Sequence, residues 1–274
     1  MTVPFRWDLV TPDRLGSLLD DVTVPEMGYL SELCRCAGKV LARGGNGDLV
    51  FVGRSLDSMF DLLGGALEGT DHRLARLPLS FQRPEDHTRP RVLRAREILA
   101  DLGITPASLA RRTRPVTFVD VVSSGRTFRS LFTLLDDWIA EEREPWPVIR
   151  LKIRFVGVTR RTATSPNAVR WKDYADWPRR LPAASVVNVS LDAMTWSHFG
   201  NWQQKLTRWF PPHRWVSGAA ETQRDDKTRK ALAEAVRLVE LGRTKEVRQM
   251  IARAIDGEPG LAEPWLRTLR SRLA

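Results

Sequence analysis

The segment from Val116 to Thr127 (VTFVDVVSSGRT) constrains the fold more than any other part of the chain. Val116 to Val122 is a β-branched, apolar run of the kind that forms a buried strand. A short Ser-Ser-Gly stretch follows it, and Arg126 to Glu144 then carries apolar residues at helical spacing. The segment therefore predicts a strand, a tight turn and a helix start in direct succession.

Other parts of the chain repeat this alternation of strand and helix. Because strands separated by helices form parallel sheets, the chain is predicted to be an α/β protein with a mainly parallel sheet flanked by helices. We expect a core at residues 1–165 with an N-terminal helical cap, and a substrate-side or accessory region at 166–274 that is Trp-rich and then helical. The expected strands are Leu49–Val52, Leu74–Phe81, Val148–Val158 and Ser185–Leu191, and the expected helices are Pro25–Arg43, Ser55–Leu67, Arg91–Leu102, a short one from Thr105 and those of 220–273.

The formal net charge of +10 indicates a partner that carries phosphate. The basic residues are spread along the chain, so charge alone does not decide between RNA and a phosphorylated small molecule. No stretch of eighteen apolar residues and no secretory signal is visible, so we expect no membrane span and a cytoplasmic protein. Cys34 and Cys36 are interpreted as idle or buried thiols, and no metal site is predicted from protein ligands.

The turn after the strand has the chemistry of a phosphate site. Unpaired N–H groups at a helix start, and the positive end of the helix dipole, both favour a bound phosphate. Ser123, Ser124, Gly125, Arg126 and Thr127 supply small residues and hydroxyl donors there. Asp120, at the strand end, is placed to accept hydrogen bonds from sugar hydroxyls. The same residues also fit an ordinary strand-end carboxylate and helix cap.

Phe118 to Thr127 (FVDVVSSGRT) resembles the signature of the type I phosphoribosyltransferases, in which two acidic residues precede a Thr/Ser-rich turn. The resemblance implies that Ser123 to Thr127 bind the 5-phosphate of phosphoribosyl pyrophosphate (PRPP) and that Asp120 binds the ribose hydroxyls. Val119 departs from the pattern, since it occupies the first acidic position. One ribose contact is therefore missing.

A second segment strengthens the resemblance, which covers about residues 25 to 160. Leu49 to Leu67 (LVFVGRSLDSMFDLLGGAL) has the form of a strand, a pyrophosphate loop at Gly53, Arg54 and Ser55, and a helix. The family binds pyrophosphate and Mg²⁺ there, so Arg54 would join Asp120 as a catalytic residue. The family's mobile loop falls on Gln82 to Arg91, with candidates Arg83, His87 and Arg89.

The sequence thus predicts a protein that binds Mg²⁺ with PRPP or a nucleoside 5-phosphate and transfers the phosphoribosyl group to a nitrogenous base. Three alternatives stay open: a non-catalytic nucleotide sensor of this fold, an RNA-binding member, and a stress-operon accessory protein with an unusual acceptor. Assembly into a homo-oligomer also stays open. Walker-type, Gly-x-Ser-x-Gly and Gly-x-Gly-x-x-Gly loops are absent from the sequence. Most tryptophans of residues 171–215 are interpreted as packing residues, and Asp136–Asp137 as a solvated helix face.

Overall fold

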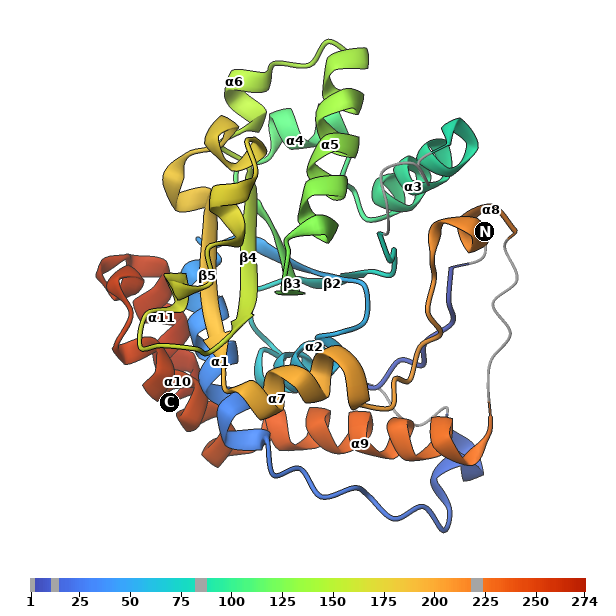
Figure 1. Ribbon diagram of the computed structural model, residues 1–274. Helices are drawn as coiled ribbons and strands as arrows, with labels where there is room; N and C mark the ends of the chain where they lie inside the picture. The colour runs from blue at the N-terminus through green and yellow to red at the C-terminus, as the bar shows by residue number, and fades with distance from the viewer. Residues whose placement is uncertain (1–2, 11–14, 82–87, 218–223) are drawn as a thin grey trace.

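The computed structural model describes residues 3–10, 15–81, 88–217 and 224–274. At its centre is a five-stranded sheet with the order β2-β1-β3-β4-β5, and every neighbouring pair of strands is parallel (Figure 1). The predicted α/β class, with a parallel sheet flanked by helices, is therefore confirmed. The strands are β1 (Asp48–Val52), β2 (Leu74–Leu77), β3 (Val116–Val122), β4 (Ile153–Arg160) and β5 (Val186–Leu191).

One face of the sheet is covered by two layers of helices. Helices α1 and α2 pack on the strands, and α9 and α10 pack in turn against α2 and α1 (Figure 1). Leu33 and Leu62 are fully buried in this core beside Val119 of β3. The helices of this face are α1 (Leu30–Arg43), α2 (Asp57–Ala66), α9 (Asp226–Arg243), α10 (Lys245–Asp256) and α11 (Pro264–Leu273).

The opposite face packs on aromatic side chains. Phe118 of β3, Phe128 of α5 and Phe155 of β4 form a buried cluster with ring centroids 5.1–5.4 Å apart. Trp171 and Trp177 extend it beyond the strands. The helices of this face are α3 (Arg89–Asp101), α4 (Pro106–Arg111), α5 (Arg126–Glu141), α6 (Trp146–Ile149) and α8 (Pro212–Ser217).

Shorter turns complete the connections. Helix α7 (Ala193–Ser197) follows β5 and runs into a π-helical turn at His198–Trp202. Single 3₁₀ turns lie at Gly16–Leu19, Pro166–Ala168, Trp171–Tyr174, Trp177–Arg180, Ala183–Ser185 and Pro259–Ala262.

Two expected strands differ from the observed ones. Residues Val148 and Ile149 belong to helix α6, and β4 begins only at Ile153. Pro147 lies in the first turn of that helix, where its fixed φ suits a helix start and its missing N–H is not needed. The strand expected at Leu74–Phe81 ends at Leu77, because Pro78 has no N–H to donate to a ladder.

The division expected near residue 165 does not coincide with a break in the sheet. Strand β5 pairs with β4 over Val186 to Leu191. Helices α9, α10 and α11 share one apolar core with α1 and α2. The last third of the chain therefore completes the same layers that the first part begins.

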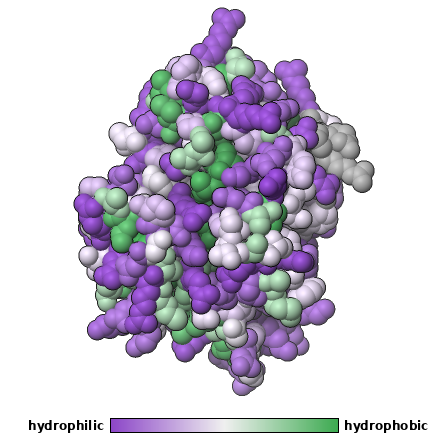
Figure 2. Space-filling view, turned by 60° about the vertical axis from the view of Figure 1, so that its left-hand side comes forward, coloured by the Kyte–Doolittle hydropathy of each residue, from purple (hydrophilic) through white to green (hydrophobic). Residues whose placement is uncertain are grey.

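Both cysteines are buried in α1, as expected of idle thiols, and burial raises the pKa of each. Within the described residues, no helix is long and apolar enough to cross a membrane. On the face seen in Figure 2, hydrophilic side chains predominate and hydrophobic ones lie between them in short streaks.

Candidate functional site

The sheet reverses its winding between β1 and β3, which are neighbours in the sheet. The chain leaves β1 through α2 on one face, whereas it leaves β3 through α5 on the other. In parallel sheets, ligands bind outside the carboxyl ends of the strands at such a reversal. Both candidate loops, Gly53–Ser55 after β1 and Ser123–Gly125 after β3, follow strands that meet at this place.

The loop after β3 leads directly into the start of α5. Gly125 is the N-cap of α5 and adopts a left-handed conformation with φ of +74°. Because glycine has no side chain, Gly125 cannot accept a hydrogen bond from the first N–H groups of the helix. Ser123, Ser124 and Arg126 are exposed, and Arg126 Nε donates to Ser124 Oγ over 3.3 Å. An anion at this point would meet N–H groups, hydroxyls and a guanidinium.

Gly125 also has a packing reason to be glycine. A Cβ at this position would lie 2.3 Å from Cε3 of Trp171. The indole is fixed there by a 2.8 Å hydrogen bond from its Nε1 to Oδ1 of Asn188, and only 3% of Trp171 is exposed. Glycine at position 125 is therefore consistent with a phosphate loop, but the close packing against Trp171 also requires a glycine there.

Asp120 lies at the end of β3 and is 6% exposed. Its Oδ1 accepts a 2.7 Å hydrogen bond from the N–H of Val121, and the Thr127 side chain also bonds to the carboxyl. Burial raises the pKa of Asp120 to about 8, although these hydrogen bonds and the charge of Lys205 oppose the shift. The carboxyl is therefore mostly protonated at neutral pH unless a ligand compensates its charge.

We expect the buried carboxyl of Asp120 to reduce stability as the pH rises. The folded state holds this proton up to about pH 8, whereas the unfolded chain releases it near pH 4, so stability falls between these values. Asp120→Asn imitates the protonated form. It should match the wild type near pH 4 and be more stable by about 2 kcal/mol or more at pH 8.5. Urea unfolding at both pH values measures the difference, and an equal difference at both would contradict it.

The loop after β1 contains the expected pyrophosphate residues. Gly53 has φ of +70°, which allows the chain to turn away from the strand. Arg54 is half-buried, and its Nη1 donates to the backbone oxygen of Thr207 over 3.0 Å. Burial lowers the pKa of Arg54, and Asp57 opposes that shift. Arg54 is therefore held beside this loop, and the other N–H groups of its guanidinium have no hydrogen-bond partner among the described residues.

A buried ion-pair network lies directly after this loop, at the start of α2. Asp57, the first residue of α2, pairs with Arg76 of β2 over 2.7 Å and with Arg6 over 3.3 Å, and it accepts from Thr207 Oγ1 over 3.0 Å. Burial alone would raise the pKa of Asp57, but these partners outweigh it and hold the pKa below its usual range. Arg6 also pairs with Asp61, whose pKa burial raises to about 6.

The segment Gln203–Phe210 crosses this loop and was not predicted to be part of the site. Lys205 Nζ donates to the backbone oxygen of Ser55 over 3.0 Å, and Phe210 accepts from Ser80 N over 3.0 Å. In the sequence, Lys205 lies in a Trp-rich stretch without a phosphate motif. The polar residues Gln203 to Lys205, which follow Trp202, gave no local signal of a binding role.

Three further expectations concern residues outside these two loops. Arg83 and His87 lie outside the described residues, and Arg89 is the exposed first residue of α3. Trp171, Trp177 and Trp215 are buried packing residues, as expected, whereas 64% of Trp202 is exposed. Within the described ranges, no three His, Cys, Asp or Glu residues gather to hold a metal ion.

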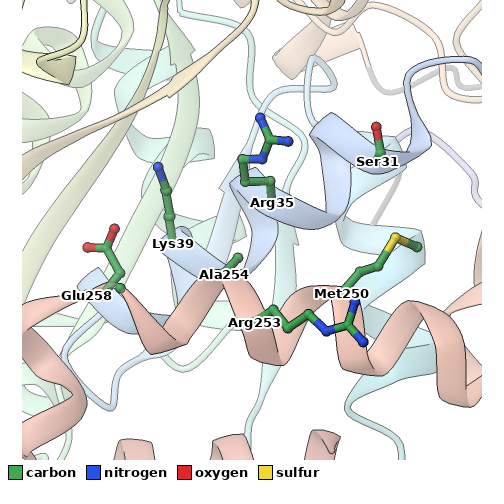
Figure 3. A pocket seen from close by; sticks show the side chains of 8 residues that line it. Ser31, Arg35, Lys39, Met250, Arg253, Ala254 and Glu258 are labelled. Atoms are coloured by element: carbon green, nitrogen blue, oxygen red, sulfur yellow. The ribbon is translucent and has the colours of Figure 1, made fainter.

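Two other hollows are less suited to phosphate. Between α1 and α10 lies a hollow of about 420 Å³; Arg35 and Lys39 extend from α1, while Arg253 extends along α10, so their charges do not converge (Figure 3). A cavity of about 710 Å³ lies beside edge strand β2. Its Arg6 is already paired with Asp61.

Comparison of the chain with family models, with curated proteins and with solved structures gave no match. The assignment of a function therefore depends on the residues and their arrangement at the β1/β3 reversal.

Proposed function

We propose that the carboxyl ends of β1 and β3 bind a ribose 5-phosphate ligand, PRPP or a nucleoside 5-phosphate, in a protein of the type I phosphoribosyltransferase kind. The observation that carries the proposal is the position of the two loops. Gly53–Ser55 and Ser123–Thr127 are far apart in the chain, yet they follow adjacent parallel strands at the reversal of the sheet.

Each part of the ligand has a partner in this arrangement. Ser123 to Thr127 would bind the 5-phosphate through N–H and hydroxyl donors at the start of α5. Asp120 would accept from the ribose hydroxyls, and Arg54 would pair with the pyrophosphate oxygens. If the protein is a transferase, a nitrogen nucleophile displaces pyrophosphate from ribose C1, and the protein's task is positioning and charge stabilisation.

Mg²⁺ fits this site mainly as part of the ligand. Mg²⁺ commonly binds one or two carboxylates together with substrate phosphates and waters. Asp120 is the one carboxyl at the end of β3, and a nearby cation would favour its charged form. Mg²⁺ would be held chiefly by the pyrophosphate oxygens, where it would neutralise charge on the leaving group.

Val119 limits the transferase proposal. It is fully buried against the α1/α2 face of the sheet, opposite to Asp120. The position that holds the first acidic residue in the family motif is therefore part of the apolar core in this protein. Release of pyrophosphate with a panel of nitrogenous bases tests for turnover, and binding without release would favour a non-catalytic sensor.

We expect Mg²⁺–PRPP to raise the midpoint of thermal unfolding. Ligand at a hundred times its Kd stabilises a protein by about 2.7 kcal/mol, which for this size corresponds to a shift of roughly 5 °C or more. Ser123→Asp places a negative charge in the exposed phosphate turn and should remove the shift. Ser165→Asp, at an exposed 3₁₀ start, is the matched control and should retain it. No shift of the wild type at millimolar ligand would contradict the proposal.

RNA binding is the second candidate, and one surface favours it. Arg73, Arg111, Arg112 and Arg114 line a hollow of about 610 Å³ at the amino end of the sheet, away from the proposed phosphate turn. Asp48 and Asp71 offset part of that charge. RNA binding with a steep salt dependence that Ser123→Asp leaves unchanged would support this alternative.

A further inference from the structure

Lys205 reaches the candidate site from a distant part of the chain. The segment Gln203–Phe210 leaves the π-helical turn and lies along the loop after β1. Three hydrogen bonds hold it there: Arg54 to the Thr207 carbonyl, Thr207 to Asp57, and Lys205 to the Ser55 carbonyl, each 3.0 Å long. Lys205 is therefore attached to the loop that would bind pyrophosphate.

The ammonium of Lys205 is held by neutral groups. Its acceptors are the backbone oxygen of Ser55 and, at 2.7 Å, Oε1 of Gln203. Among the described residues, no carboxylate lies within 4 Å of Nζ, although sixteen other ion pairs are formed in that part of the chain. Nζ also lies 5.8 Å from the centroid of the Phe199 ring, and one of its three N–H donors has no oxygen acceptor among the described residues.

The acidic groups around Lys205 already have other partners. Asp57 pairs with Arg76 and Arg6, and Asp61 pairs with Arg6. Glu234 of α9 accepts from Tyr29 and from Gln203. The positive charge of Lys205 also acts on Asp120 of β3, where it opposes the burial that raises the pKa of that carboxyl.

We propose that Lys205 binds the pyrophosphate group of the ligand, with an anionic oxygen taking the place of the ion-pair partner that the protein does not supply. The proposal rests on the proposed function and adds a residue that the loop motifs do not contain. The Lys205 residue is partly exposed. A ligand without pyrophosphate, such as ribose 5-phosphate, would bind without this contact.

The protonation of Lys205 supplies a second measurement. Burial lowers its pKa to about 8, against the attraction of Asp57. Since the charged form is lost as the pH rises through this value, pyrophosphate affinity should fall between pH 7 and pH 9.5, whereas an arginine stays charged. The charged and titratable groups that face the amine are Asp57 and Asp61 of α2, Arg54 of the loop, Glu234 of α9, Asp120 of β3 and His198 of the π-helical turn.

Calorimetric titration of the full chain with Mg²⁺–pyrophosphate and with ribose 5-phosphate tests the proposal. Lys205→Met should weaken pyrophosphate binding by about 10- to 100-fold, the range for a hydrogen bond between charged groups, and leave ribose 5-phosphate binding unchanged. Lys205→Arg should restore binding at pH 7 and lose less affinity than the wild type at pH 9.5. Lys39→Met, on α1, is the control for loss of a surface charge.

The outcomes separate the two proposals. If the wild type binds both ligands and Lys205→Met binds pyrophosphate as tightly, Lys205 has no ligand role while the proposed function stands. If the wild type binds neither ligand, both proposals are overturned. Should Lys205→Met fail to fold, the comparison of Lys205→Arg with the wild type at the two pH values decides, because ligand titration affects both proteins equally. Identical pH profiles would overturn the role of Lys205.

Discussion

Gly242→Ala is expected to destabilise the protein by about 2–4 kcal/mol, a large effect for one added methyl group. Helices α2 and α9 cross so closely that a Cβ at Gly242 would lie 2.2 Å from the backbone oxygen of Leu62. Since the obstacle is backbone and not a flexible side chain, the helices must separate. Urea unfolding measures the change as a lower midpoint with an unaltered slope.

Gly257→Ala provides the matched control for this change. Gly257 follows α10, is exposed, and has nothing within 4 Å of the position where a Cβ would lie. A gain of up to about 1 kcal/mol is expected there, because alanine restricts the unfolded chain more than glycine does. Equal losses from both substitutions would show that the α2/α9 contact is not the cause.

Gly65 of α2 lies in the same contact, since a Cβ there would lie 2.0 Å from the backbone oxygen of Val239. Once one methyl group has pushed the helices apart, the second meets less resistance. The double substitution of Gly65 and Gly242 should therefore cost less than the sum of the single ones.

The sequence predicted individual elements better than their arrangement. Strand β3 has the predicted bounds, Val116–Val122, because a strand buried on both faces is a continuous apolar run. The expected helix Pro25–Arg43 begins only at Leu30. Strand order follows from contacts between segments far apart in the chain. Nothing local in Ser185–Leu191 indicates that this run closes the sheet beside β4.

The same distinction applies to the candidate site. Ser123–Thr127 and Gly53–Ser55 were recognisable as candidates because each turn is continuous in the sequence. Lys205, Arg6 and Arg76 carry no local signal, since each becomes part of the site only when folding brings it to the loop after β1. Charged side chains are seldom buried without partners, but a sequence does not say which of many arginines will be buried.

Asp57→Ala is expected to cost about 3–5 kcal/mol, because it leaves the buried guanidinium of Arg76 without its carboxylate and removes one of the two carboxylates that pair with Arg6. Arg76 and Arg6 both pair with Asp57, and the side chains of all three are 10% exposed or less. The pKa of Asp57 lies below its usual range, so its contribution is present above about pH 4 and is lost as the pH falls through the lowered pKa. The difference from the wild type, measured by urea unfolding, should therefore be largest at neutral pH and decrease in acid.

Asp176→Ala is the control for Asp57→Ala, because Asp176 is 97% exposed and forms a surface pair with Arg179, for which no measurable loss is expected. Asp57→Ala also removes the anchor of Thr207 and so loosens the segment that carries Lys205. Pyrophosphate should then bind more weakly to Asp57→Ala even at temperatures where the variant is fully folded. Unchanged pyrophosphate affinity in the folded variant would show that Lys205 keeps its position without Asp57. A loss of stability that does not depend on pH would show that the ion pairs of Asp57 are not the origin of that loss.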